Sequence, residues 1–354
     1  MKVFGSVVVL LLLSGVVVQG QSAESECKPA SDMSFICDIE SAEDLVLVPE
    51  TKWVLASGYS PGGAVYAIET QSRAFHQAYD PAKVAYQSQT YPSCSTPPDA
   101  NTFVGHGLSI QAGENGHSTL YVVGHGGREA IEVFDVTSAG AVPELTWVGC
   151  VMMPEGLDAN SVAVMRDGSL RLTVLMHPGY TFAQVFEGVK TGAVYGWSPG
   201  DAAIEKIVGS ELPGNNGIEV SSSGEELYVV SSGLSTISVF SNTNPARLLR
   251  ATPRMDFSPD NVHMTAAGLL MTGGPSWVDH NCAAAQDFDL ETFASCPRGS
   301  VGATFNPVTL KEVQRWSAGA NAVFSNSTMA LEVGAEIWFG TFSGTRIGII
   351  DTTE

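Results

Sequence analysis

A three-strand unit recurs six times along the chain, and this repeat constrains the fold more than any other feature. Each copy begins with two short apolar strands joined by a turn of hairpin type, such as Arg166-Asp167-Gly168 or Ser222-Ser223-Gly224. The third strands of the six copies are Ala64–Ile68, Ala130–Phe134, Ala193–Trp197, Thr236–Phe240, Val301–Phe305 and Ile347–Ile350. The period of about 50 residues is typical of the blades of a β-propeller.

The repeat therefore predicts an all-β fold, a single six-bladed β-propeller over residues 21–354. A β-sandwich would have fewer strands and no long period. The last copy ends at Asp351 without a fourth strand, whereas Ser34–Cys37 precedes the first copy. We expect Ser34–Cys37 to complete the last blade, because pairing the two ends of the chain closes the ring and removes open sheet edges.

The first 20 residues have the pattern of a signal peptide. Lys2 supplies a positive charge, an apolar run extends from Val7 to Val18, and Val18-Gln19-Gly20 is a cleavage site with small residues. The run of about 12 residues is shorter than the roughly 20 that cross a bilayer as a helix. We therefore expect a secreted, extracellular protein.

Six cysteines follow this segment, and an even number in an oxidising compartment favours disulfides. The shortest loops predict the pairs Cys27–Cys37 and Cys282–Cys296, which leaves Cys94 with Cys150. One N-glycosylation sequon is present at Asn326, and the strand pattern places it beside the central channel, where a glycan is hard to accommodate.

The charge of the chain excludes some partners. With 17 Lys and Arg against 37 Asp and Glu, the formal net charge is −20. A surface this acidic repels nucleic-acid phosphates and attracts cations, so we expect no nucleic-acid partner. We expect a monomer that acts on a small molecule, and the sequence leaves association with membranes or lipoproteins open.

Polar residues recur where the innermost strand of each blade begins. In a propeller these strand starts converge on the central channel at one face. The positions hold side chains with oxygen or nitrogen atoms in all six copies: Glu43, His106, Asn160, Asn216, Asp260 with Asn261, and Ser327 with Thr328. Six distant segments are therefore predicted to become neighbours.

Each position alone is better explained as a turn, since Asn216-Gly217 is a common turn dipeptide. Turns would not fall at the same register in every blade. The recurrence of polar residues at this register therefore favours a ligand-binding site in the channel. Carboxylate and amide oxygens are the ligands that Ca²⁺ prefers, and two carboxylates would neutralise one ion. The sequence predicts a calcium site in the central channel.

Several segments around these positions resemble the signature segments of the paraoxonase/arylesterase family, and more distantly the gluconolactonases. They follow in the same order over nearly the whole mature chain: Ser41–Leu45, Gly105–Ser109, Leu120–His125, Ile131–Phe134, Asn160–Ala163, Asn216–Ile218, Asp260–Val262 and Ser327–Ala330. The resemblance implies that the catalytic calcium is held by Glu43, Asn160, Asn216, Asp260 and Asn261. It also implies a catalytic histidine pair, His106 and His125.

The family has a second, structural calcium, which the resemblance assigns to Asp44 and the backbone carbonyl of Leu108. Here the sequence departs from the family, because Ser161 stands where an Asp ligand is usual. Losing a carboxylate weakens this site, so we expect one calcium ion per chain. The family's disulfide between the two ends of the chain is also missing, since no Cys follows Cys296.

Together these features predict a calcium-dependent hydrolase of lactones and aryl or carboxylic esters. Calcium would polarise the carbonyl of the substrate. His106 would act as the general base on a water molecule, and His125 would tune the pKa of His106. The alternatives are a calcium-dependent sugar lactonase or phosphotriesterase, and a non-catalytic binding scaffold. We expect the pocket walls in the loops Asp80–Ala100 and Pro275–Gly299.

The other histidines do not fall at the starts of innermost strands. We expect them at the surface or hydrogen-bonded in the core: His76, His117, His177, His263 and His280. Ser327 lacks a convincing Ser-His-Asp arrangement, which argues against a nucleophilic serine.

Overall fold

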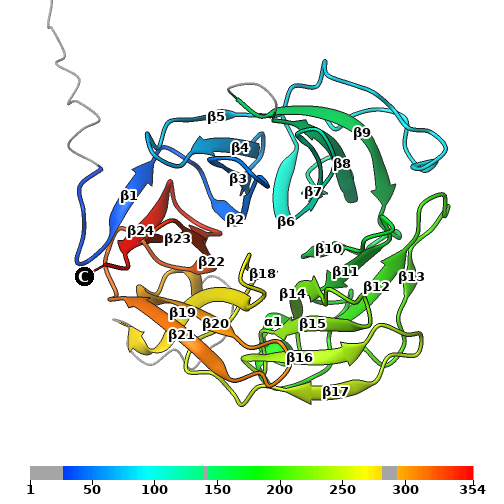
Figure 1. Ribbon diagram of the computed structural model, residues 1–354. Coiled ribbons are helices and arrows are strands. Elements are labelled where there is room, and N and C mark those ends of the chain that lie inside the picture. The colour runs from blue at the N-terminus through cyan, green and yellow to red at the C-terminus, as the bar shows by residue number, and fades with distance from the viewer. Residues whose placement is uncertain (1–26, 139–141, 281–292, 354) are drawn as a thin grey trace, which may run out of the picture.

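The computed structural model describes residues 27–138, 142–280 and 293–353, which form a closed ring of six four-stranded antiparallel sheets (Figure 1). The predicted all-β, six-bladed propeller is therefore confirmed. The predicted signal peptide, residues 1–20, lies outside the described residues. None of the helices among the described residues is long and apolar enough to cross a membrane.

The first three blades each follow the chain from the innermost to the outermost strand. Blade 1 contains β2–β5, which span Ala42–Leu47, Trp53–Gly58, Ala64–Glu69 and Phe75–Gln77. Blade 2 contains β6–β9, which span Val104–Ala112, His117–His125, Ala130–Thr137 and Glu144–Met152. Blade 3 contains β10–β13, which span Val162–Val164, Leu170–Val174, Ala193–Trp197 and Glu205–Lys206.

The second half of the ring repeats this plan. Blade 4 contains β14–β17, which span Asn215–Val220, Glu226–Ser231, Thr236–Ser241 and Leu248–Ala251. Blade 5 contains β18–β21, which span Val262–Met264, Leu270–His280, Arg298–Phe305 and Glu312–Ala318. Blade 6 contains β22–β24, which span Ser327–Val333, Glu336–Thr341 and Arg346–Asp351, together with β1, which spans Ser34–Cys37.

The two ends of the chain close the ring as predicted. Strand β1 pairs antiparallel with β24, with Ser34 opposite Ile349 and Cys37 opposite Arg346. The blue and red ends of the ribbon therefore lie side by side in Figure 1. This pairing gives the last blade its fourth strand, so no sheet is left with only three.

Apolar packing between neighbouring blades holds the ring together. Six clusters of buried apolar side chains form, one at each interface between adjacent blades. Trp147 at one interface and Trp338 at another are fully buried. Burying large apolar side chains contributes roughly 1.5–3 kcal/mol each, so interface packing is the main force that keeps the blades in register.

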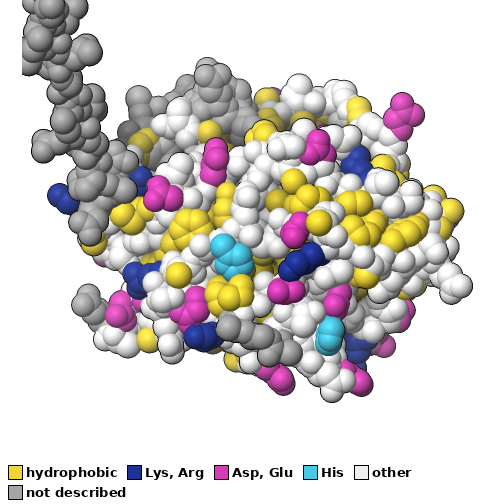
Figure 2. Space-filling model, turned by 90° about the horizontal axis from the view of Figure 1, so that it is seen from above, with side chains coloured by type: hydrophobic (Ala, Val, Ile, Leu, Met, Phe, Trp, Pro, Cys, Tyr) yellow, Lys and Arg dark blue, Asp and Glu magenta, His cyan; other side chains and the backbone are white. Residues whose placement is uncertain are grey.

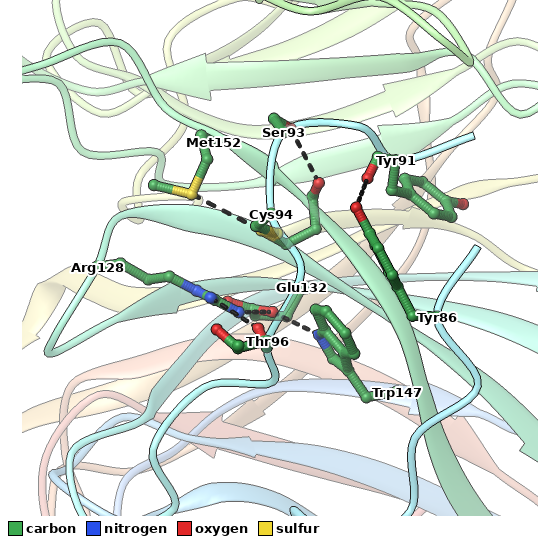
Figure 3. Close-up of a disulfide and its surroundings, with 10 residues drawn as sticks. Tyr86, Tyr91, Ser93, Cys94, Thr96, Arg128, Glu132, Trp147 and Met152 are labelled. Carbon is green, nitrogen blue, oxygen red and sulfur yellow. Dashed lines mark hydrogen bonds and ion pairs between the residues drawn. A yellow bond between two sulfur atoms is a disulfide. The ribbon is translucent and has the colours of Figure 1, made fainter. Parts of the chain in front are cut away.

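Two of the predicted disulfides are present, Cys27–Cys37 and Cys94–Cys150. The second joins the segment before blade 2 to the outer strand β9, near Trp147 (Figure 3). Cys296 is also disulfide-bonded, but its predicted partner Cys282 lies outside the described residues. These disulfides fit the oxidising compartment that the sequence predicts.

The loop Asp80–Ala100 does not line the central cavity, so this part of the prediction is wrong. Its aromatic side chains pack on the outer strands instead. Tyr86 stacks on Trp147 with ring centroids 5.7 Å apart, and Tyr91 stacks on Trp197 at 5.6 Å. These stacked pairs help to bury Trp147 and Trp197 and hold the loop on the outer part of blades 2 and 3.

A short helix that the sequence did not predict, α1 (Phe182–Phe186), lies between β11 and β12. Thr181 and Gln184 form a capping box, in which the Thr181 side chain accepts from the Gln184 backbone and the Gln184 side chain accepts from the Thr181 backbone. This cap allows so short a helix to form, and it places Phe182 and Phe186 beside the channel.

The face shown in Figure 2 carries scattered acidic side chains. They lie among apolar and uncharged groups and do not gather in one patch. The acidic excess of the sequence therefore does not mark a binding site on this face.

Candidate active site

Four of the residues predicted for the channel lie at irregularities in the innermost strands. The strand register shifts between Ala42 and Leu45, between Gly105 and Leu108, between Asn215 and Ile218, and between Ser327 and Ala330. These four bulges contain Glu43, His106, Asn216 and Thr328. A bulge re-aims a side chain out of the alternation of a regular strand, which explains why polar residues at the same register reach the channel.

Backbone contacts between blades bring these strand starts together. The Gly217 N–H donates to the Asp260 carbonyl at 3.0 Å, and the Asn261 N–H donates to the Thr328 carbonyl at 2.9 Å. A Cβ at Gly217 would lie 2.4 Å from the Asp260 carbonyl oxygen, so only glycine allows blades 4 and 5 to approach this closely.

The strand starts surround a cavity of about 610 Å³. Its polar wall contains seven residues predicted from the sequence: Glu43, His106, His125, Asn160, Asn216, Asp260 and Thr328. Its apolar wall contains Val104, Leu175, Met176, Phe182, Phe186, Pro275, Phe293 and Phe342. The size and the mixture of a large apolar wall with a few polar groups are typical of a small-molecule site.

Three of the predicted ligands carry buried oxygens without a hydrogen-bond partner among the described residues: Glu43 Oε2, Asn160 Oδ1 and Asn216 Oδ1. The Asn216 amide nitrogen donates to Ser232 Oγ at 2.9 Å, which fixes the orientation of the amide and leaves its oxygen free. We call Glu43, Asn160, Asn216 and Asp260 the cavity cluster. Unpaired buried oxygens are costly unless something binds them, and this set of hard oxygens fits Ca²⁺.

The carboxyls of the cavity cluster are hard to ionise without a bound cation. Burial raises the pKa of Asp260 to about 7, with Asp44 adding to the effect. Burial, Asp260 and Asp44 together raise the pKa of Glu43 well above its usual value. A divalent cation would remove this repulsion, so the electrostatics also favour a metal. Among the described residues no group of three or more His, Cys, Asp or Glu side chains is arranged to hold a metal, so the amide oxygens would be essential.

Asn261 has a different place from the other predicted ligands. It is buried but is not among the residues that line the cavity. Its amide nitrogen donates to Glu43 Oε1 at 2.7 Å, so in this structure it orients Glu43. Its role as a calcium ligand stays a prediction.

The residues of the predicted second calcium site do not fit a metal ion in their present arrangement. Asp44 Oδ1 accepts from the Leu45 N–H and from His263 Nε2, both at 2.8 Å. Asp44 Oδ2 accepts from the Leu108 N–H at 2.8 Å and from His263 at 3.0 Å. Ser161 contributes a buried hydroxyl and no charge. A histidine thus occupies the place beside Asp44 that the resemblance assigns to a cation.

A second acidic residue lies close to this pair. Glu219 accepts from the backbone N–H groups of Val220 and Met264 at 2.7 and 2.9 Å. Although burial favours the neutral imidazole, Asp44 and Glu219 raise the pKa of His263 above its usual value. We call Asp44, His263 and Glu219 the Asp44 cluster, and its charged groups have partners within the protein.

The two predicted catalytic histidines contact each other in the cavity wall. His106 Nδ1 lies 3.0 Å from His125 Nε2, and His106 Nε2 lies 3.8 Å from Glu43 Oε1. The Tyr59 ring packs on His106 with centroids 4.5 Å apart. Burial and the neighbouring His125 lower the pKa of His106 well below its usual value, so this imidazole is neutral and able to accept a proton near pH 7.

The remaining predictions concern residues outside the cavity. None of the other five histidines lines it, as far as the described chain goes. His117 forms an exposed pair with Asp135, whereas His177 bonds to Tyr195 and Thr191. Asn326 of the sequon is 1% exposed and donates to Ser343 Oγ, so it is a poor acceptor for a glycan. Ser327 does not line the cavity.

Sequence reasoning missed several residues of the site. Tyr59, Glu129, Asp158 and the aromatic residues of α1 all line the cavity. Glu129 lies in the turn after β7 and pairs with His125, whereas the repeat pattern marks only strand starts. An acidic residue soon after a catalytic histidine was the only available signal.

No known protein family and no curated protein matches this sequence. Solved structures match its fold. A gluconolactonase from Xanthomonas campestris superposes with a TM-score of 0.52 at 14% identity, covering 94% of this chain and 93% of that chain. Regucalcin from Agrobacterium tumefaciens, described as a calcium-binding protein, gives a TM-score of 0.51 at 10% identity, covering 89% and 92%.

A luciferin-regenerating enzyme gives a TM-score of 0.54 at 10% identity, covering 92% of this chain and 96% of that chain. Identities this low establish similarity of fold alone. The chain is thus structurally similar to the gluconolactonase and regucalcin type of six-bladed propeller, and the resemblance to paraoxonases stays a prediction.

Proposed function

We propose that the protein is a secreted, calcium-dependent hydrolase of apolar lactones and of aryl or carboxylic esters. The observation that carries the proposal is one cavity that combines three buried, unpartnered oxygens with a pair of hydrogen-bonded histidines. The similarity of fold to a gluconolactonase and to a calcium-binding regucalcin is compatible with it.

The cavity cluster would hold the ion through the oxygens of Glu43, Asn160, Asn216 and Asp260, with Asn261 holding Glu43 in place. When bound, Ca²⁺ supplies a Lewis acid for the carbonyl oxygen of the substrate. The two carboxylates balance its charge.

His106 acts as the general base in this proposal. Its Nδ1 atom is engaged with His125, so Nε2 is the nitrogen that can take a proton from water. The low pKa of the buried imidazole keeps it in the basic form, and a positioned base of this kind accelerates hydrolysis by roughly 10²–10⁴-fold. No covalent intermediate with the protein is required.

The apolar wall favours aromatic or aliphatic substrates over sugar lactones. Phe182 and Phe186 of α1 line the cavity together with Phe293, and Phe186 and Phe293 stack with centroids 6.2 Å apart. The hydroxyls of a sugar would need polar partners that this wall lacks, and leaving them unpaired weakens binding. A sugar lactonase and a phosphotriesterase, which use similar metal sites, are therefore the less favoured functions.

The test compares the hydrolysis of an aryl ester, an apolar lactone and a sugar lactone, each with and without chelator. We expect activity on the first two substrates that chelation abolishes. His106→Gln should lower kcat about 10²–10⁴-fold with unchanged metal content, while His117→Gln, an exposed histidine outside the cavity, serves as the matched control.

A protein without hydrolytic activity on any of the three substrates would favour the second candidate, a binding scaffold. Full activity after verified removal of the metal would exclude the calcium mechanism. We further infer that the protein acts as a monomer outside the cell, as the disulfides and the acidic composition suggest.

A further inference from the structure

We propose that Glu129 is a positioning residue of the histidine pair, which fixes the tautomers of His125 and His106 so that His106 Nε2 carries the free lone pair. The inference rests on the proposed hydrolase function and adds a residue to it. Glu129 Oε2 lies 2.5 Å from His125 Nδ1, and His125 Nε2 lies 3.0 Å from His106 Nδ1. The three side chains therefore form one continuous chain of hydrogen bonds.

The direction of these bonds follows from their end groups. An ionised carboxylate can only accept, so Glu129 requires a proton on His125 Nδ1. A neutral His125 then has its lone pair on Nε2, which can only accept from His106 Nδ1. His106 in turn has its lone pair on Nε2, the atom directed toward Glu43 and the cavity cluster. One carboxylate thus determines which nitrogen of His106 can receive a proton from water.

The local backbone places Glu129 within hydrogen-bond distance of His125. Gly126 and Gly127 both have positive φ, at 76° and 121°, and they turn the chain back immediately after His125. The Glu129 carbonyl accepts from the Met153 N–H at 3.0 Å, which fixes the start of the next strand. The carboxylate therefore returns to the end of β7, where His125 lies.

The neighbouring cation does not compete for Glu129. Arg128 donates to both carboxylate oxygens of Glu132, at 2.7 and 2.8 Å, and to the Thr96 carbonyl (Figure 3). Glu132 is in turn bound to Trp147 Nε1 at 2.8 Å. With Arg128 held in this network, the charge of Glu129 is left to act on His125.

The proton transfer balances within this chain. Water gives a proton to His106 Nε2 as its oxygen bonds to the substrate carbonyl carbon, and His106 becomes an imidazolium. The Glu129 carboxylate stabilises positive charge on the histidine pair, as an acidic partner does for a base in comparable arrangements. The proton later returns to the leaving alkoxide, so no other reactant is consumed.

The first test observes the tautomers directly by ¹⁵N NMR of the histidine-labelled, full-length protein, with His125→Gln used to assign the signals. We expect wild-type His125 to be protonated on Nδ1 and His106 also on Nδ1. In Glu129→Ala this preference should be lost. Protonation of wild-type His125 on Nε2 would overturn the inference, whether or not the protein proves to be a hydrolase.

The second test measures kcat and KM for Glu129→Gln and Glu129→Ala with an apolar lactone. We expect kcat to fall about 10–100-fold, as is usual for partners that orient a catalytic group, with KM and calcium content unchanged. Glu155→Gln removes an exposed charge outside the cavity and is the matched control.

An active wild type with unchanged kcat in both Glu129 variants would refute the role of Glu129 and leave the hydrolase intact. A fall in kcat that comes with lost calcium or altered thermal unfolding would also count against it, since a positioning role predicts neither.

Discussion

The cavity cluster and the Asp44 cluster lie on the same inner strands, and they satisfy their charges in different ways. In the cavity cluster, Glu43, Asn160 and Asn216 carry oxygens without partners among the described residues. In the Asp44 cluster, both carboxylate oxygens of Asp44 accept from backbone N–H groups and from His263. The first cluster needs something from outside the chain, and the second does not.

The difference arises from neighbouring residues. Glu43 and Asp44 are adjacent in β2, within the bulge between Ala42 and Leu45, yet their side chains meet different partners. Glu43 meets other oxygens, whereas Asp44 meets the imidazole of His263. A protonated histidine within the protein can neutralise a buried carboxylate as a metal ion does.

Among changes that affect only one of the two clusters, Asp260→Asn should have the largest effect on calcium binding and activity. Removing one of the two carboxylates should abolish calcium binding and reduce ester and lactone hydrolysis together, by about 10²–10³-fold or more, the cost of losing one electrostatic stabiliser of the transition state. Elemental analysis and rates on both substrates measure the change.

The matched control is Asp256→Asn, which removes a carboxylate paired with Arg315 on the outer part of blade 5. Such an exposed pair contributes about 0–1 kcal/mol, so its activity should stay normal. A variant Asp260→Asn that retains both calcium and activity would show that the cavity cluster is not the metal site.

The sequence predicted the cavity cluster because its residues share one register. Glu43, Asn160 and Asn216 each mark the start of an innermost strand, and closure of the ring makes strand starts converge. The same periodicity predicted the six blades and the pairing of Ser34–Cys37 with the last strand. These features depend on backbone geometry, which a repeat in the sequence encodes directly.

The partners of these residues could not be predicted in the same way. Glu129 reaches His125 only because a turn of two glycines reverses the chain, and His263 reaches Asp44 across the channel from another blade. Contacts of this kind depend on side-chain directions and loop paths, for which a repeat carries no signal.

Replacing His263 with Asn should test the Asp44 cluster through stability. Removing one partner of a buried charge pair leaves Asp44 uncompensated, which costs about 3–5 kcal/mol of unfolding free energy. Denaturant unfolding at constant calcium measures the loss. The double variant with Asp44→Asn should be more stable than the sum of the two single changes predicts, because the two residues interact directly.

The wild-type protein should contain one calcium ion per chain after dialysis. Two ions per chain would mean that the Asp44 cluster also binds a metal. Additive effects in the double-variant cycle would mean that His263 is not the partner of Asp44.

The smallest effect should be a pH dependence that belongs to the cavity cluster alone. In the chelated protein, burial raises the pKa of Asp260 to about 7, above the usual value of 3.8. A group with a raised folded-state pKa contributes stability that is fully present below its unfolded pKa and is lost as pH rises through the folded value. The chelated protein should therefore lose stability as the pH rises from about 4 to about 7, whereas bound calcium stabilises the ionised form of Asp260.

The quantity to measure is the difference in Tm between the calcium-loaded and the chelated protein. His263, whose pKa is raised by Asp44 and Glu219, lies outside the cavity cluster, so its titration contributes to the Tm of both forms and largely cancels in this difference. At 100-fold excess of calcium over Kd the stabilisation is about 2.7 kcal/mol, and it should grow with pH because Kd itself falls as the carboxyls ionise. A difference that stays constant across this range would mean that Asp260 does not titrate in the chelated protein, and the electrostatic distinction between the two clusters would no longer hold.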